Sequence, residues 1–369
     1  MEHRFTGPSY TLGIEEELMI VDAEGFDLVN AIESLLGEAP HGEIKPELME
    51  SVLEISTDPC SDTATASKQL RALRAQVIAT AGEHGLTIGS AGTHPFAMWE
   101  DQRIVGRDRY RDLVSALRFV ARQELLFGLH VHVGVDGPDK AIHVANGMRV
   151  HAPLLLALSA NSPFWRARAT GLASGRMPIF RTFPRVGMPP AYAGWDDFEA
   201  RIEFLTRCGV IEDYTWMWYD VRPHPNFGTV EIRAMDAQTR IEHTLGLAAL
   251  IQAMVHELAE HFDAGRELPD LPAEVLDENR WLAARFGLDG ELVDLPSTDR
   301  VPSRELAGRL LDRLEPRARE LGSAAELDGV RDLIEHGTGA ERQTLVYDAN
   351  EDFGDVLREI VDTTVPAMD

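Results

Sequence analysis

The chemistry that this sequence can support is concentrated in three short segments that mix charged or imidazole side chains with aliphatic ones. The first, GIEEELMIV at residues 13–21, carries three consecutive carboxylates inside an apolar run. The second, GLHVHVGV, contains His130 and His132, and the third, TVEIRAMD, contains Glu231 and Arg233. A carboxylate removed from water costs several kcal/mol unless a cation meets it. We therefore expect cationic partners for these segments.

Strand periodicity divides each segment into two faces, because successive side chains of a β-strand point to opposite sides of the sheet. Glu15 and Glu17 then share one face, while Glu16 falls on the face of the aliphatic residues. By the same rule the two histidines share a face, as do the glutamate and arginine of the third segment. Taken singly, these patterns also fit a water-facing edge strand, a hydrogen-bonded histidine pair or a cross-strand salt bridge. Their recurrence favours strands that line one site.

A fourth segment, KPELMESVLEIST, also reads as a strand with acidic residues. Glu50 and Glu54 have the same parity, whereas Glu47 can join them only through a bend at the end of the run. A solvated strand face is the alternative interpretation, and this segment is the weakest of the four.

Carboxylates and imidazoles without thiolates suit hard divalent ions such as Mg²⁺ or Mn²⁺. Such ions beside arginines are typical of phosphoryl transfer, in which a protein positions phosphates and stabilises their charge. Arg233 is placed to contact phosphate, and Arg222 could hold a substrate carboxylate bidentately. An irregular stretch at 171–194 could close over a nucleotide or substrate, although a solvated basic loop is equally consistent. Its candidate arginines are Arg176, Arg181 and Arg185.

The elements that must position these residues indicate an α+β fold with a largely antiparallel sheet, because strict βαβ alternation is missing. The charged strand faces would line a funnel or half-barrel. Strands are expected at 10–22, 86–92, 126–136, 216–222 and 228–236, the last two forming a hairpin. Helices are expected from Asp62 to about Gly82, and at 107–123, 138–160, 196–207 and 238–262.

Length and composition predict a single globular unit. The 369 residues are 44% hydrophobic, enough for a large core. We expect a catalytic core over about 10–265 and a helical C-terminal extension over 266–369. The N-terminal segment lacks the apolar core of a secretory signal and no apolar run is long enough for a membrane span, so a cytoplasmic location is expected.

Charge and motifs exclude several other classes of function. A net charge of −26 disfavours nucleic acid and membrane surfaces as partners. Cys60 and Cys208 are too few and too far apart for a disulfide scaffold or a cysteine metal cluster. None of the lysines lies in a Walker A loop, and no Rossmann fingerprint follows a strand. The partners that remain are small-molecule substrates, and the chain could also assemble into a homo-oligomer.

These motifs, in this order, resemble the carboxylate–amine ligases of the bacterial glutamate–cysteine ligase type 2 family, relatives of glutamine synthetase. The similar segments include GIEEELMIV, ELMESVLEIST, GSAGTHPFA, GLHVHVGV, LALSANSPFW, WYDVRPHPNFGTVEIRAMD and ENRWLAARFGLDG. The resemblance implies a glutamine synthetase-like fold and an ATP-dependent ligase. In that reaction the substrate carboxylate takes the γ-phosphoryl group of ATP, and an amine then displaces phosphate from the acyl phosphate. Glutamate and cysteine as the two substrates come from the family name alone.

The resemblance also implies roles for individual residues. It matches the metal ligands of the family to Glu15, Glu17, Glu54, His130 and Glu231, with Glu47 as a looser match. It matches Arg233 to the arginine that contacts phosphate. The candidate catalytic residues are Arg233, Glu54 and His132, and the candidate substrate or ATP contacts are Arg222, Arg233 and Arg181.

Two other classes of function compete with this interpretation. Paired carboxylates with an HxH motif could activate water in a metal-dependent hydrolase, although a zinc hydrolase would use more histidine ligands. A regulator that binds nucleotide or amino acid without turnover would have no reason to keep a costly charged cluster.

Overall fold

The fold is built around one antiparallel sheet whose strands differ in length. The computed structural model describes residues 1–269 and 271–366. The sheet has seven strands, in the order β2-β3-β1-β5-β7-β6 with β4 paired to β1, and these strands pair with one another in antiparallel orientation. The strands are β1 (Leu12–Asp22), β2 (Glu43–Pro46), β3 (Val52–Ser56), β4 (Leu86–Gly89), β5 (Gly128–Gly134), β6 (Val221–His224) and β7 (Thr229–Asp236).

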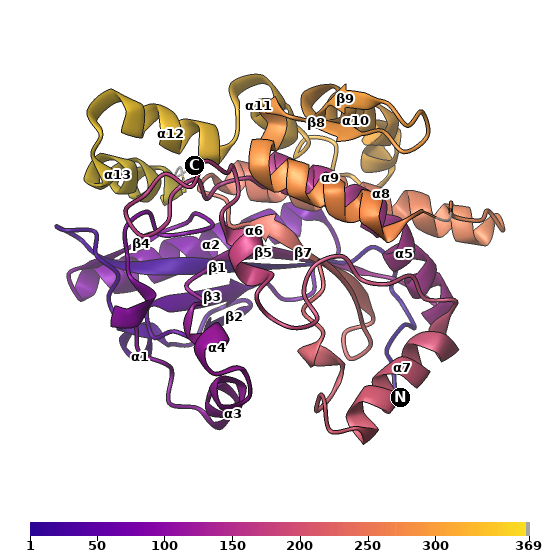
Figure 1. Ribbon diagram of the computed structural model, residues 1–369, viewed down its shortest axis with the longest axis horizontal. Coiled ribbons are helices and arrows are strands. Elements are labelled where there is room, and N and C mark those ends of the chain that lie inside the picture. Colours follow the sequence, from indigo (N-terminus) through magenta and orange to yellow (C-terminus); the bar gives the residue numbers. More distant parts are fainter. Residues whose placement is uncertain (270, 367–369) are drawn as a thin grey trace.

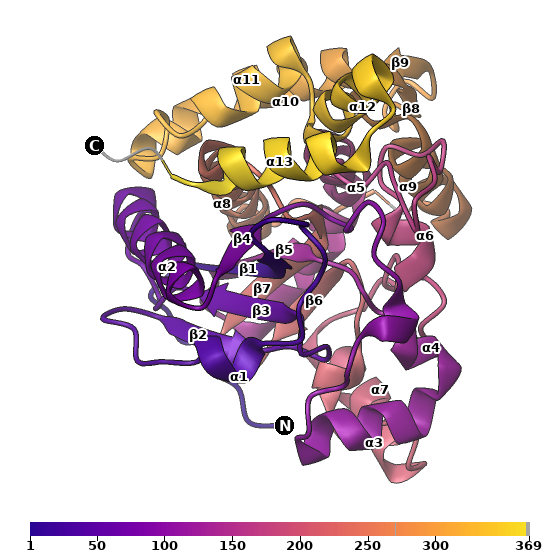
Figure 2. The ribbon, with the colours of Figure 1, turned by 90° about the vertical axis from the view of Figure 1, so that its left-hand side faces the viewer.

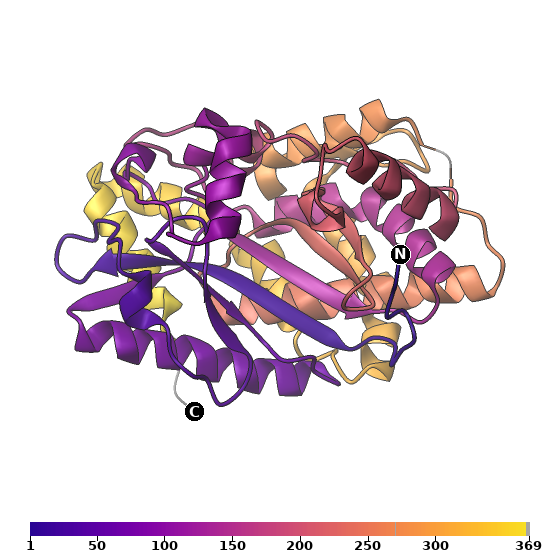
Figure 3. The same cartoon turned by 90° about the horizontal axis from the view of Figure 1, so that it is seen from below.

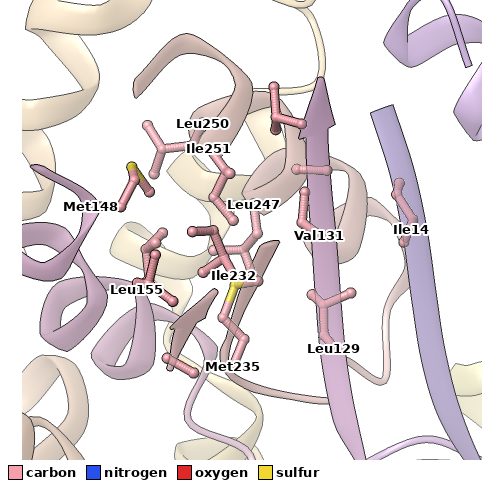
Figure 4. Close-up of a cluster of buried hydrophobic side chains, with 14 of the residues drawn as sticks. Ile14, Leu129, Val131, Met148, Leu155, Ile232, Met235, Leu247, Leu250 and Ile251 are labelled. Atoms are coloured by element: carbon pink, nitrogen blue, oxygen red, sulfur yellow. The ribbon is translucent and has the colours of Figure 1, made fainter. Parts of the chain in front are cut away.

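Two long helices, α5 (Pro138–Ser159) and α8 (Ile241–Asp263), cover the aliphatic face of this sheet. Figure 4 shows side chains of both helices, such as Leu155 and Leu247, against Val131 and Ile232 of the central strands. All four are fully buried or nearly so. Burying this face supplies the main hydrophobic stabilisation of the fold. The predicted alternation of the strands is therefore confirmed.

Helix α2 (Thr63–Glu83) lies beside α8 and packs on β1 and β4. Asp62 caps its N-terminus, because the Asp62 side chain accepts a hydrogen bond from the backbone N–H of Thr65. Its Arg74 is fully buried and donates two 2.7 Å hydrogen bonds to the carboxylate of Glu16. Glu16 is the acidic residue that periodicity places on the aliphatic face. Its partner is thus an arginine of the helix layer, which the sequence analysis did not identify.

The C-terminal helices form a further layer above α5 and α8, coloured orange to yellow in Figures 1 and 2. Helix α9 packs on α5, α10 and α11 pack on α8, and α13 packs on β4. The expected division into a core and an extension near residue 265 stays a prediction. This layer comprises α9 (Ala273–Phe286), β8 (Glu291–Val293), β9 (Arg300–Pro302), α10 (Ser303–Glu320), α11 (Asp328–His336), α12 (Gly339–Asn350) and α13 (Phe353–Thr364).

Several elements differ from their predicted bounds. Residues 216–222 are not one strand: a 3₁₀ turn at Tyr214–Trp216 precedes β6, which begins at Val221 and continues through Pro223. Proline is tolerated there because β6 is an edge strand of the sheet. The acidic run of the fourth segment is interrupted as well, since β2 ends before Glu47 and β3 begins after Glu50.

Two helical segments also depart from expectation. The helix predicted at 107–123 is divided at Arg118, whose φ of 54° lies outside the helical region. The resulting pieces are α3 (Asp108–Leu117) and α4 (Phe119–Arg122). The stretch at 171–194 contains the short helix α6 (Arg176–Phe180). The remaining helices are α1 (Ile32–Leu35) and α7 (Trp195–Arg207).

Among the described residues, none of the helices has both the length and the apolar character that crossing a bilayer requires.

The buried pair of Glu16 and Arg74 yields a stability prediction. Arg74→Met leaves the Glu16 carboxylate without its buried cation and should lower the free energy of unfolding by about 3 to 5 kcal/mol. The double variant Glu16→Leu/Arg74→Met removes both charges and should lose less than the single variant. Urea unfolding followed by circular dichroism measures both.

Arg71→Met is the matched control, because Arg71 lies on the same helix and pairs with the half-exposed Glu242. A pair of this kind contributes about 0 to 1 kcal/mol. Equal losses for Arg71→Met and Arg74→Met would contradict the importance assigned to the buried pair.

Candidate active site

Cross-strand pairing brings the predicted site residues together on the face of the sheet opposite α5 and α8. Figure 3 views the strands from below, with the C-terminal helices behind them. Because directly opposed residues of antiparallel strands point to the same side, each pair contributes two neighbouring side chains. The opposed pairs are Glu17 with Glu54, Glu15 with His130, His132 with Glu231, and Glu231 with Arg222.

A pocket of about 270 Å³ opens onto this face. Its lining combines carboxylates and aromatic rings with cationic side chains, so it is polar and suited to a charged ligand. The carboxylates are those of Glu15, Glu17, Glu47, Glu54 and Glu124, and the rings are those of Tyr110, Phe183, Trp216 and Trp218. The cationic residues are Lys45, Arg109, Arg222 and Arg233.

One acidic group in this pocket consists of Glu17, Glu47 and Glu54, whose carboxylate oxygens lie within 4.8 Å of one another. Burial and the neighbouring charge of Glu17 raise the pKa of Glu47 to about 7. Burial and the charges of Glu15 and Glu47 raise the pKa of Glu54 well above its ordinary value. Lys45 offers partial compensation at 3.7 Å from Glu54. The group fits a hard divalent cation, which would relieve this repulsion with oxygen ligands.

A second group consists of Glu15, His132 and Glu231 and is compensated differently. Burial opposes the ionisation of Glu231, but the charges of Arg222 and Arg233 outweigh it and hold the pKa of Glu231 well below its ordinary value. His132 Nε2 lies 3.5 Å from Glu15 Oε1 and 3.7 Å from Glu231 Oε1. This nitrogen is buried and has no hydrogen-bond partner in the part of the chain that the structure describes. Burial opposes the protonation of His132, but the charges of Glu231 and Glu15 outweigh it and raise the pKa of His132, so this nitrogen would bind a metal ion between the two carboxylates only after losing its proton.

The histidines occupy distinct positions. His130 Nδ1 lies 3.3 Å from Glu15 Oε2, and the ring lines the pocket. Burial and the charge of Arg233 lower the pKa of His130, which favours the neutral imidazole that a metal ion requires. His132 instead belongs to the second acidic group. Both histidines thus lie beside Glu15, as the shared strand face predicts.

Arg233 owes its position to an irregularity in the pairing of β5 with β7. Leu129 opposes Met235 and Val131 opposes Ile232, so two residues of β7 lie opposite His130 alone. Such bulges redirect side chains next to functional sites. The Arg233 side chain contacts the carboxylate of Glu231 and lines the pocket. Strand periodicity alone gives the face of Arg233 but not this bulge.

The structure does not give the other predicted arginines equivalent roles. Arg222 donates to both oxygens of Glu231, at 2.6 and 3.1 Å, and to the carbonyl of Thr215. Most of its donors are therefore used inside the protein, although it lines the pocket. Arg181 forms an ion pair with Asp277 and lines a different surface hollow.

Three further residues singled out from the sequence are Arg176, Glu50 and Arg185. Arg176 is buried, and its guanidinium lies so near Gly128 that a Cβ at this position would clash with Nη2 of the arginine. Glycine at this position therefore makes room for the arginine. Glu50 lies in the turn before β3 and pairs with Arg103 at 2.8 Å, away from the pocket. Arg185 donates to the carbonyl of Trp216, at the aromatic part of the pocket.

Sequence reasoning missed several pocket residues, and Glu124 is the carboxylate among them. It lies between α4 and β5, in ARQELLFG, where no periodic pattern distinguishes it from a surface residue. Tyr110, on α3, and Trp216 and Trp218, before β6, were likewise not identified. The sequence indicates that these residues belong to the pocket only in that they lie close along the chain to the segments of the predicted site.

Comparisons of sequence place the chain among known proteins. A family model described as glutamate-cysteine ligase family 2 matches residues 11–362. A protein of Rubrobacter xylanophilus with the provisional name glutamate–cysteine ligase 2-1 is 43% identical over 373 residues, covering 100% of this chain and 98% of its own. A protein of Sorangium cellulosum, with the provisional name glutamate–cysteine ligase 2, is 41% identical over 358 residues, covering 96% of each chain.

Solved structures with the same fold include two ligases at low sequence identity. The glutamate–cysteine ligase of Francisella tularensis in complex with AMP has a TM-score of 0.70 and 15% identity, covering 100% of this chain and 91% of its own. A bifunctional glutathione synthetase of Pasteurella multocida has a TM-score of 0.66 and 15% identity, covering 97% of this chain and 51% of its own. These matches confirm the predicted α+β fold class with its antiparallel sheet, which this chain shares with the glutamate–cysteine ligase structure.

The uncompensated acidic group yields a pH-dependent metal prediction. Because the folded-state pKa of Glu47 is raised, its contribution to the stability of the metal-free protein falls as pH rises from the ordinary glutamate value through about 7. A bound divalent cation requires the deprotonated form. Mg²⁺ or Mn²⁺ should therefore raise Tm more at about pH 8 than at about pH 5.5, as measured by thermal unfolding at constant ionic strength.

Glu47→Gln should raise the Tm of the metal-free protein at the higher pH and reduce the shift caused by the metal ion. Glu50→Gln, three residues away and outside the pocket, is the matched control and should keep the shift of the unchanged protein. A metal-induced shift that is equal at both pH values and in both variants would contradict the assignment.

Proposed function

The chain belongs to glutamate–cysteine ligase family 2, and we propose that it is an ATP-dependent carboxylate–amine ligase acting on amino-acid substrates. Glutamate is the proposed carboxylate substrate, and its γ-carboxylate would be joined to an amine. Mg²⁺ or Mn²⁺ is the proposed metal ion, and the cytoplasm the proposed location. The observation that carries this proposal is the acidic group of Glu17, Glu47 and Glu54 in one pocket with Arg233.

The pocket supports phosphoryl transfer because it combines two kinds of charge in a small volume. Phosphoryl transfer between a nucleotide and a carboxylate brings several negative charges together, so positioning and charge stabilisation dominate catalysis. Glu17, Glu47 and Glu54 would hold a divalent cation, and Glu15, His132 and Glu231 offer a second set of ligand atoms. Divalent ions at these positions supply positive charge to phosphate oxygens when bound.

The remaining residues act through their own charges and hydrogen bonds. The Arg233 guanidinium lines the pocket and would contact a phosphate of the nucleotide. Arg222, held by Glu231 and by backbone carbonyls, keeps the Glu231 carboxylate oriented and ionised. We therefore propose that Arg222 is a positioning residue rather than a direct substrate clamp. Arg181 carries no role in this proposal, because its ion pair with Asp277 lies at a different hollow.

The proposed reaction has two steps. The glutamate γ-carboxylate oxygen attacks the γ-phosphorus of ATP, which forms an acyl phosphate and releases ADP. The acceptor ammonium loses one proton to become the nucleophilic amine, which attacks the acyl carbon; phosphate leaves and takes up the second proton lost by the nitrogen, and an amide bond results. The aromatic rings that line the pocket would help to keep water from the acyl phosphate, which water would otherwise hydrolyse. This need to exclude water distinguishes the proposed ligase from a hydrolase.

The reaction is tested by product formation and by one substitution. With ATP and Mg²⁺, the purified protein should release ADP and phosphate only when glutamate and an acceptor amine are both present, and mass spectrometry should detect a γ-linked product. Glu231→Gln removes the carboxylate that orients two arginines and should reduce turnover by about 10²-fold or more. Circular dichroism should show an intact fold.

Glu203→Gln, on the exposed surface of α7, is the control and should retain full turnover. Glu231→Gln with unchanged ADP release would remove Glu231 from the proposed site. ATP binding without turnover in any mixture of amino acids and amines would contradict the ligase proposal itself.

A further inference from the structure

Glu124 is a pocket carboxylate for which the proposed metal ligands give no role. Its backbone N–H donates to the carbonyl of Ala121 at the end of α4, and its side chain lines the pocket together with Glu17 and Glu47. Among the described residues, the Glu124 carboxylate accepts no hydrogen bond that meets ordinary geometry and forms no ion pair within 4 Å. Glu124 is only half-buried, so its carboxylate lines the pocket and can be reached by a ligand.

A carboxylate that lines a pocket without a partner among the described residues can accept charge-assisted hydrogen bonds from a cation that comes from outside the chain.

The chemistry of the pocket favours an ammonium group over a further metal ion as that cation. Glu124 belongs to none of the three groups of described residues whose ligand atoms converge within 4.8 Å. The same pocket is lined by the rings of Tyr110, Trp216 and Trp218. Aromatic faces attract ammonium groups through their quadrupole, and a carboxylate accepts charge-assisted hydrogen bonds from them. A hard metal ion would instead call for several converging oxygen ligands.

We propose that Glu124 binds the ammonium group of a substrate and so orients that substrate in the pocket. This inference rests on the proposed ligase function. Both the carboxylate substrate, glutamate, and the acceptor amine enter the site with an ammonium group, and the recognition chemistry is the same for each. Glu124 is thereby a substrate-binding residue whose loss affects one substrate rather than the nucleotide.

The test compares Glu124→Gln with the unchanged protein and with Glu203→Gln. Glutamine keeps the shape of the side chain and removes its charge, so Glu124→Gln should fold at least as stably as the unchanged protein. Its KM should rise about 10- to 100-fold for one ammonium-bearing substrate, while the KM for ATP and the Mg²⁺ requirement stay within about twofold. A higher KM for the amine assigns Glu124 to the acceptor, and a higher KM for glutamate assigns it to the donor.

Glutarate, which is glutamate without its amino group, provides a chemical control for the donor case. The unchanged protein should prefer glutamate to glutarate, and Glu124→Gln should lose that preference. Unchanged KM values for both substrates would overturn the proposal, as would a raised Mg²⁺ requirement, which would make Glu124 a metal ligand.

Equilibrium binding separates this proposal from the proposed function. If the unchanged protein catalyses no ligation, isothermal titration with glutamate and with each candidate amine still measures the effect of Glu124→Gln on affinity. A loss of about tenfold or more for an ammonium-bearing ligand supports the role of Glu124 even then. Equal affinities in Glu124→Gln and Glu203→Gln overturn it. Glu124→Ala should reproduce the loss, because it also removes the charge.

Discussion

The ion pair between Glu16 and Arg74 is the interaction on which the arrangement of layers depends. Glu16 lies on the aliphatic face of β1, and Arg74 reaches it from α2. The same guanidinium donates to the backbone carbonyls of Gln238 and Thr239, just before α8, and Thr244 donates to Glu16. One buried pair thus fixes the sheet relative to two helices. Desolvation offsets much of the attraction within such a pair, so its loss is most costly when only one of the two charges is removed.

The opposite face of the sheet carries charges that the protein compensates only in part. Glu231 is matched by Arg222 and Arg233, and its pKa is held low. Glu47 and Glu54 lack sufficient cationic neighbours, so burial and mutual repulsion raise the pKa of each. A fold retains such repulsion when a ligand relieves it, which is why strongly perturbed carboxylates in a pocket indicate a functional site. On the aliphatic face a matched ion pair holds helices against the sheet, whereas on the opposite face unmatched carboxylates leave charge for a ligand to compensate.

The C-terminal layer is connected to the site through the strand that carries Arg233. Arg280 of α9 forms a buried ion pair with Asp220, immediately before β6. The carbonyl of Asp220 accepts the backbone N–H of Arg233 at 2.8 Å. Helix α9 thus supports the backbone next to the pocket, although its own side chains do not line it. Distant parts of the chain contribute to the site by holding its strands in place.

The sequence by itself determined which residues share a strand face, because side-chain alternation has a period of two and needs no tertiary information. It therefore predicted that Glu15, Glu17, His130 and Glu231 would lie on one side of a sheet, and the order of motifs predicted the family. Only the tertiary structure decided the cation that meets Glu16, since Arg74 is 58 residues away. It also decided that Arg222 turns toward Glu231, that Arg181 faces Asp277 and that Glu124 enters the pocket. These outcomes depend on register, on a bulge and on helix packing, all of which arise from contacts between residues far apart in the chain.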